Sequence, residues 1–144
     1  MPWQARRREA SDMNRRTLIL GAAAALAPLP AVADPSAPVG LILVGASWCP
    51  FCKGAAQALH AAAGPAGLPV LVASHDGRPI PPFEEFVDAR GHPLAAGVRQ
   101  WPTLLFVHLP SQRVFATIEG FRNARAYLGQ VRATLTAARE AGYA

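Results

Sequence analysis

Cys49 and Cys52 are the two cysteines of this 144-residue chain, and two residues separate them. They follow an apolar run, and Pro50 between them is typical of the first position of a helix, so we expect both thiols at a helix N-terminus. There the helix dipole stabilises a thiolate, and two thiols this close can form a disulfide and reopen it. The pair is suited to thiol–disulfide exchange, although a Cys-x-x-Cys pair read alone also fits a zinc half-site or a structural bridge.

The residues around the cysteines predict a parallel strand–helix–strand unit. Residues 39–46 are continuously apolar, as in a strand buried on both faces of a sheet. Residues 50–63 predict a helix, and residues 68–74 predict the second strand. The helix face that should point inward holds Cys52, Ala55, Ala56, Leu59 and Ala62. Cys52 should therefore be buried, and Cys49 should be the more exposed thiol.

The C-terminal half predicts a short helix, two further strands and a final helix. A turn-rich segment at residues 75–82 leads into the predicted short helix at residues 83–89. Residues 103–109 and 114–119 predict strands, and the short turn between them makes the pair antiparallel. Residues 123–141 predict the last helix. Its apolar stripe comprises Leu128, Val131, Leu135 and Ala138. We expect one α/β domain with a mixed four-stranded sheet flanked by helices.

The first 33 residues have the pattern of an export signal. Arg15 and Arg16 precede the weakly apolar segment 18–27, and small residues lead up to Ala33, after which a signal peptidase would cleave. The paired arginines favour the twin-arginine route, with Sec export as the alternative. A cytosolic protein with a basic tail and an uncleaved membrane anchor are less favoured readings. We expect a periplasmic protein.

Cleavage would leave a mature domain of residues 34–144. The leader holds five of the 14 basic and two of the nine acidic residues, so the formal net charge would fall from +5 to +2. No basic stripe with interleaved aromatic residues remains, so nucleic-acid binding is not expected. In an oxidising compartment a cysteine pair is structural or catalytic, and a bridge that encloses two residues removes little entropy from the unfolded chain. This favours the catalytic role.

Taken together, the motifs resemble the thioredoxin superfamily. A predicted strand leads into Trp-Cys-Pro-Phe-Cys-Lys at residues 48–53, and Trp-Pro-Thr at residues 101–103 precedes the later strand, the hairpin and the final helix. The resemblance covers nearly all of residues 39–141. It implies a thioredoxin-like fold. Because only a few residues of the mature domain precede Val39, we expect the N-terminal strand and helix of full thioredoxin to be absent. The resemblance also implies a thiol–disulfide oxidoreductase that acts on protein substrates and takes part in cell redox homeostasis.

The resemblance assigns a role to each matching residue. Cys49 would be the nucleophile that attacks a partner disulfide, and Cys52 would resolve the mixed disulfide, so the two form the redox-active pair. Pro102 matches the cis-proline of the family. The substrate-binding residues would be Trp48, Pro50, Phe51, Trp101, Pro102 and Thr103. No cofactor is implied, and no metal site is expected because no two histidines share a close ligand spacing.

Three features depart from the family pattern. Leu43 stands where thioredoxins place a buried aspartate that carries protons to the resolving cysteine, so that proton must move through water or another group. The dipeptide Pro50-Phe51 resembles that of glutaredoxins and periplasmic Dsb proteins rather than Gly-Pro. The segment from His75 to Pro93 is longer than in a minimal thioredoxin and is a candidate partner-recognition loop.

The favoured function is an exported thiol–disulfide oxidoreductase working as a reductase. No group beside Cys49 is evident that would stabilise its thiolate strongly and make the disulfide a strong oxidant. Its partners would be protein thiols or disulfides and a membrane electron-donor or oxidant protein, and it would act as a monomer. The alternatives are a binding or maturation module with a permanently closed disulfide, and a glutaredoxin-like enzyme, against which Thr103 argues.

Overall fold

The computed structural model describes residues 38–143. The predicted export signal, its cleavage after Ala33 and the predicted lack of an N-terminal strand and helix all concern residues outside this range. The elements in chain order are β1 (Val39–Gly45), α2 (Pro50–Ala63), β2 (Val70–Ser74), β3 (Val87–Asp88), the 3-10 helix η2 (Ala89–Gly91), β4 (Thr103–His108), β5 (Arg113–Glu119) and α3 (Ala124–Glu140). Within the described residues, neither α-helix has the length and apolar character of a membrane span.

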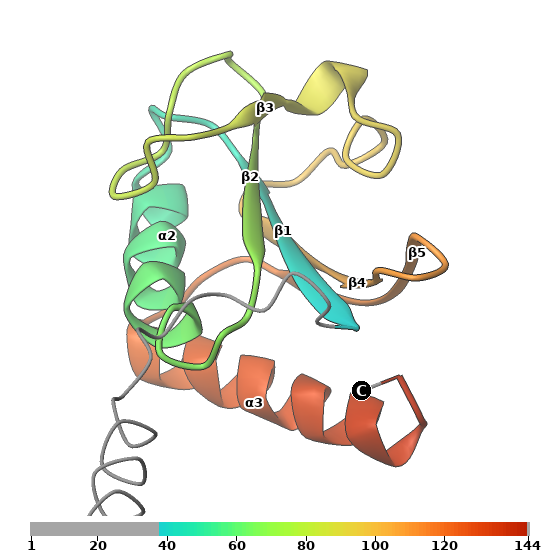
Figure 1. The fold of residues 1–144 in the computed structure, drawn as a ribbon. Helices are drawn as coiled ribbons and strands as arrows, with labels where there is room; N and C mark the ends of the chain where they lie inside the picture. Colours follow the sequence, from blue (N-terminus) through green and yellow to red (C-terminus); the bar gives the residue numbers. More distant parts are fainter. Residues whose placement is uncertain (1–37, 144) are drawn as a thin grey trace, which may run out of the picture. The chain divides into compact units, whose positions relative to one another are not determined.

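The strands form one mixed sheet in the order β3-β2-β1-β4-β5 (Figure 1). β1 pairs in parallel with β2 and antiparallel with β4, and the last two strands form the predicted antiparallel hairpin. β1 is buried along its whole length because it has a neighbour on each edge and cover on each face. The predicted parallel unit β1–α2–β2 is confirmed, and it places the cysteines at the carboxyl end of the central strand.

The two α-helices cover one face of the sheet. Leu41 and Leu43 of β1 point to this face and pack in one cluster with residues of α2 and α3. Ile42 and Val44 alternate with them and point to the opposite face, as the two-residue period of a strand requires. There the segment 89–98, which includes η2, supplies the cover.

The predicted helix at residues 83–89 is wrong. Residues 87 and 88 form β3 instead, and Val87 pairs with Ala73 at the edge of β2. A helix of seven residues has little stability of its own, whereas the open edge of β2 offers backbone partners and an apolar surface for Val87. β3 also makes the sheet five-stranded rather than four-stranded.

The buried faces of the two helices differ in detail from the predicted stripes. In α2, Ala62 is exposed while Ala58 and Ala63 are buried. In α3, Tyr127 is buried while Leu128 is half-buried. α2 packs against α3 as well as against the sheet. Its buried stripe is therefore wider than that of a helix that contacts a sheet alone.

Candidate active site

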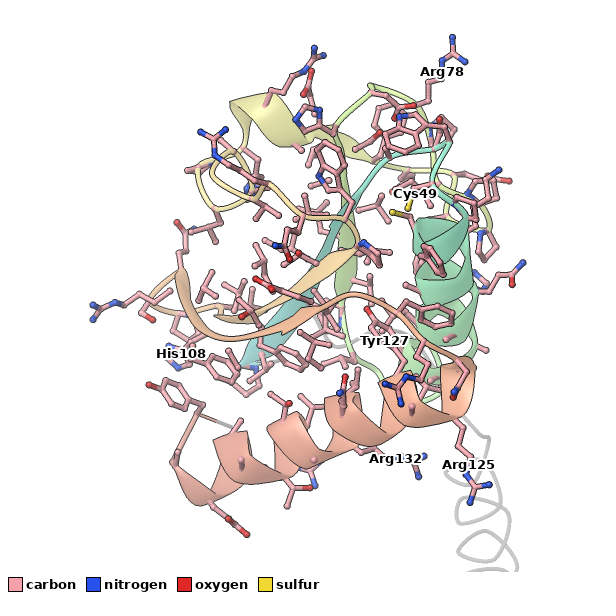
Figure 2. All side chains as sticks on the ribbon, turned by 180° about the vertical axis from the view of Figure 1, so that it is seen from behind. Cys49, Arg78, His108, Arg125, Tyr127 and Arg132 are labelled. Atoms are coloured by element: carbon pink, nitrogen blue, oxygen red, sulfur yellow. The ribbon has the colours of Figure 1, made fainter. Side chains whose placement is uncertain are left out.

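Cys49 lies in the turn between β1 and α2 (Figure 2). Its N–H donates to the carbonyl of Ala46 at 3.2 Å, and its carbonyl accepts from the N–H of Lys53 at 3.2 Å. Cys49 is the N-cap residue of α2, and its Sγ accepts a hydrogen bond from the N–H of Cys52 at 3.3 Å. Pro50 follows at the helix start, where a missing N–H leaves no partner unsatisfied. An amide N–H and the helix dipole therefore both favour negative charge on the Cys49 sulfur.

Cys52 lies deeper than Cys49, one turn along the inner face of α2. Its exposed fraction is 0%, against 6% for Cys49. A Cβ added to Gly45 would come within 2.8 Å of the Cys52 Sγ, so the glycine at the end of β1 makes room for the second thiol. The predicted order of exposure is confirmed. Cys49 is nevertheless itself buried, because it belongs to the core cluster against which Trp101 packs.

The environment of Cys52 favours its protonated form. Burial away from water raises the pKa of the Cys52 thiol to about 12, and the hydrogen bond with Cys49 and the negative charge of Asp76 act in the same direction. A protonated thiol is a poor nucleophile, so Cys52 should react slowly at neutral pH. Both cysteines are free thiols in this structure.

Three segments of the chain bring aromatic side chains to the cysteine turn. Trp48 and Phe51 are 64% and 60% exposed, although both are large and apolar. The ring of Trp48 meets that of Trp101 edge to face, with centroids 6.0 Å apart. The ring of His75 also packs on Trp101, with centroids 4.6 Å apart. The structure thus brings predicted site residues from residues 48–51 and 101–103 together.

The Trp101–Pro102 peptide bond is cis, as the resemblance implied. Pro102 is fully buried, and its carbonyl accepts from the N–H of Gly120 at 2.8 Å. Thr103 is 4% exposed, and its hydroxyl donates to the carbonyl of Gln100 at 2.8 Å. The buried side chains of Pro102 and Thr103 therefore fix the conformation of the loop, whereas the Trp101 side chain is half-exposed.

Leu43 supplies no proton-carrying group beneath the cysteines. It pairs with Val72 on one side and Leu104 on the other, and it is fully buried in the same cluster as Cys52. Leu43, which replaces the buried aspartate of thioredoxins, therefore lies in the core under the site. The nearby phenol of Tyr127 is buried and finds no hydrogen-bond partner among residues 38–143, and burial raises its pKa well above the ordinary value.

Sequence reasoning missed a polar cluster beside the cysteine turn. The carboxylate of Asp76 accepts hydrogen bonds from the N–H of Ser47 at 3.1 Å, from the Ser47 hydroxyl, and from the Ser74 hydroxyl at 2.8 Å. These bonds, those from Ser47 first, lower the pKa of Asp76 to about 2, so the group is a carboxylate at neutral pH. A signal was present in the sequence, because Ser74 ends, and Asp76 follows, the strand that pairs in parallel with the strand before Cys49.

The histidines do not gather into a ligand set. His60 packs against Phe83, and His108 packs against Tyr143, far along the chain from His75. Over residues 38–143, no group of three or more His, Cys, Asp or Glu side chains is placed to hold a metal ion.

Many solved structures resemble this chain, among them an isomerase and two thioredoxins. Thio-disulfide isomerase from Thermus thermophilus is 28% identical, with a TM-score of 0.51 over 74% of this chain and 80% of that one. The germline-specific thioredoxin Deadhead from Drosophila melanogaster is 18% identical, with a TM-score of 0.50 over 74% of this chain and 99% of that one. The exposed lipoprotein thioredoxin Etrx1 from Streptococcus pneumoniae is 24% identical, with a TM-score of 0.47 over 65% of this chain and 83% of that one.

A family model extends the comparison to the sequence itself. No curated protein matches the chain significantly. The model of TraF, the F plasmid transfer operon protein, matches residues 30–125, which include both cysteines and the cis-proline loop. The fold of residues 38–143 is thioredoxin-like, with the Cys-x-x-Cys turn at the start of α2 and the cis-proline before β4. The chain belongs to the TraF family of thioredoxin-superfamily proteins.

Proposed function

We propose that this protein is a thiol–disulfide oxidoreductase that exchanges disulfides with protein substrates through Cys49 and Cys52. The observation that carries the proposal is the asymmetry of the pair. Cys49 caps a helix and accepts an amide N–H on its sulfur, while Cys52 is buried and held as a thiol. Cys49 is thus the sulfur suited to attack a disulfide, and Cys52 stays protonated until the mixed disulfide has formed. The 28% identity to a protein described as a thio-disulfide isomerase is consistent with this chemistry.

The exchange proceeds in two displacements at sulfur. The Cys49 thiolate attacks one sulfur of a substrate disulfide and forms a mixed disulfide, and the other substrate sulfur leaves as a thiolate that takes up a proton. Cys52 then loses its proton to water or a nearby base and attacks the Cys49 sulfur, which releases the second substrate thiol. Two electrons pass to the substrate, and the protein ends with a Cys49–Cys52 disulfide.

Trp48, Phe51 and Trp101 form the substrate-docking surface in this proposal. Two of these side chains are strongly exposed, and apolar exposure concentrated at a reactive group marks an interaction site. The aromatic rings would contact apolar residues that flank a substrate cysteine, and the loop at Pro102 would line the extended segment. Pro50 contributes at the edge of the turn, and Thr103 supports the loop from inside.

We place the protein in the periplasm as a monomeric reductase. The pattern of residues 1–33 supports export. Phe51 between the cysteines carries no charge that would stabilise a thiolate, which supports a reducing rather than a strongly oxidising protein. Each turnover as a reductase leaves the disulfide, so a dithiol partner must restore the thiols. A membrane protein that carries electrons across the bilayer would fill this role.

The test is the rate at which the protein reduces a model protein disulfide with a small dithiol as electron source. Wild type should accelerate the reaction, and Cys49→Ser should abolish the acceleration. Cys52→Ser should accumulate a covalent mixed disulfide visible by intact mass. Full activity of Cys49→Ser would overturn the assignment of the nucleophile. A wild type that binds unfolded protein but exchanges no disulfide would point to a binding module instead.

A further inference from the structure

Ser47, Ser74 and Asp76, here called the Asp76 cluster, join two turns at the carboxyl edge of the sheet. Both carboxylate oxygens of Asp76 are used: Oδ1 accepts from the Ser47 N–H at 3.1 Å and from the Ser74 hydroxyl at 2.8 Å, and Oδ2 accepts from the Ser47 hydroxyl. Ser47 lies two residues before Cys49, in the turn that leaves β1. Asp76 lies in the turn that leaves β2, 29 residues along the chain.

The turn that carries Asp76 is itself fixed to the sheet. The N–H of His75 donates to the carbonyl of Gly45 at 2.8 Å, which continues the pairing of β1 with β2 by one bond. The Ser74 hydroxyl also accepts from the N–H of Arg78 at 3.1 Å, so the same oxygen closes the turn after Asp76. Asp76 is thus a rigid anchor, and Ser47 is the residue that it holds.

The cysteine turn has few other anchors of its own. Between the end of β1 and Cys49, the bond from the Cys49 N–H to the carbonyl of Ala46 closes the turn locally, and Trp48 is largely exposed. Ser47 is therefore the point at which the turn is tied to a neighbouring strand. A shift of Ser47 would move the N-cap sulfur relative to the helix amides that stabilise its charge.

We propose that Asp76 is a positioning residue of the redox site, which through Ser47 holds the turn that delivers Cys49 to the N-terminus of α2. The inference rests on the proposed function and names a residue that acts on it from outside the Cys-x-x-Cys motif. A carboxylate suits the position because it can accept all three hydrogen bonds at once, and bonds to an ionised acceptor are stronger than neutral ones.

The charge of Asp76 has a second effect at the same site. Its negative charge acts on Cys52, where Leu43 provides no charged group. This charge opposes ionisation of Cys52, but burial is the larger cause of the raised pKa, so Cys52 stays protonated at neutral pH without Asp76 as well. Removing that charge should therefore leave the dithiol–disulfide equilibrium at neutral pH close to that of wild type.

Two substitutions separate the hydrogen bonds from the charge. In Asp76→Asn, the amide oxygen can keep both bonds at Oδ1, and the amide nitrogen can donate to the Ser47 hydroxyl. Asp76→Ala loses all three bonds. Asp88→Asn is the matched control, because Asp88 is an exposed acidic residue that bonds to its neighbour Arg90 and not to the cysteine turn.

Three measurements follow on each reduced and folded variant: hydrogen exchange of the Ser47 amide, the rate of disulfide exchange, and the dithiol–disulfide equilibrium against glutathione. Asp76→Ala should lose protection of the Ser47 amide against hydrogen exchange. It should also slow disulfide exchange by about tenfold or more, because small displacements of reacting groups have large effects on rate. Asp76→Asn should retain protection of the Ser47 amide, most of the rate of disulfide exchange and the wild-type equilibrium. Asp88→Asn should match wild type in all three.

The proposal would be overturned if Asp76→Ala kept both the wild-type protection of the Ser47 amide and the wild-type rate of disulfide exchange. If Asp76→Ala fails to fold, Ser47→Ala replaces it, because that variant removes the hydroxyl donor alone and should weaken protection and rate in the same direction. Amide exchange and the glutathione equilibrium need no catalytic turnover. A wild type without exchange activity would therefore refute the proposed function, while the amide measurement would still decide the role of Asp76.

Discussion

The two sulfurs of this site are chemically unequal because their surroundings differ. Cys49 receives the N–H of Cys52 at the positive end of α2, whereas Cys52 faces the core and the backbone of Gly45. Burial penalises the charged form of Cys52 and raises the pKa of its thiol. Cys52 does not sit at the N-cap, where the helix dipole would oppose this effect. The spacing of the motif therefore sets the distance between the thiols, and the fold gives them the different surroundings that the proposed order of attack requires.

The inequality predicts selective alkylation of the reduced protein. With the pKa of Cys52 raised to about 12, this residue stays protonated through the neutral and mildly alkaline range and ionises as pH rises toward that value. Iodoacetamide at pH 7 to 9 should therefore modify Cys49 alone, measured by peptide mass spectrometry. Denatured protein is the control and should be modified at both. Equal modification of the two cysteines in the native protein would contradict the asymmetry.

Gly45 predicts a second effect at the residue scale. A Cβ there would lie 2.8 Å from the Sγ and 3.1 Å from the Cβ of Cys52, and 3.3 Å from Ile80. Because Cys52 is short and buried, it has little room to yield, and Gly45→Ala should lower the free energy of unfolding by about 1–3 kcal/mol, the usual cost of overpacking. Urea denaturation measures the change.

Gly97→Ala is the matched control for Gly45→Ala. Nothing lies within 4 Å of a Cβ at Gly97, and its backbone is not left-handed. This variant should unfold at nearly the wild-type urea concentration. A loss of stability as large as that of Gly45→Ala would show that the close approach of Cys52 is not the cause.

At the scale of elements, α3 supports the site from below α2. Its Tyr127 packs edge to face on Phe121, whose ring edge approaches Gly54 of α2 so closely that a Cβ there would lie 2.5 Å from it. Val131 joins the same core cluster as Cys52. The position of α2, and with it the cysteine turn, depends on a helix that carries no predicted site residue.

The start of α3 offers a test of this support. The Asn123 side chain caps the helix by accepting the N–H of Ala126 at 2.8 Å. Asn123→Ala should lower the free energy of unfolding by about 1 kcal/mol, the usual cost of losing an N-cap, while Asn123→Asp should not. Thermal or urea unfolding measures both. Equal stability of the alanine variant and wild type would mean that this cap is not used in solution.

The elements around the cysteines could be predicted because local signals and tertiary contacts agree there. The apolar run of β1, the N-terminal proline of α2 and the hairpin of β4 and β5 each appear close to their predicted bounds. The segment 83–89 could not be predicted in this way, because pairing with β2 decides its conformation. Asp76 was missed for a similar reason, since its partner Ser47 is distant in sequence.

At the scale of the whole molecule, the arrangement concentrates reactive and apolar groups at one edge of the sheet. α2 and α3 cover one face and the segment 89–98 covers the other, so the carboxyl edge of β1 and β2 is left for the cysteine turn, Trp48 and Asp76. The match to the TraF model ends at residue 125, near the start of α3. The core nevertheless continues into α3 through Tyr127 and Val131.

We infer that Cys49 and Cys52 form a redox-active pair rather than a permanent bridge. The most direct test of this inference is the reduction potential of the folded protein, measured by equilibration with glutathione or a small dithiol and intact mass after thiol trapping. We expect a potential well above about −300 mV, in the range of disulfides that exchange in cells. A potential below about −300 mV, typical of structural disulfides, would contradict it.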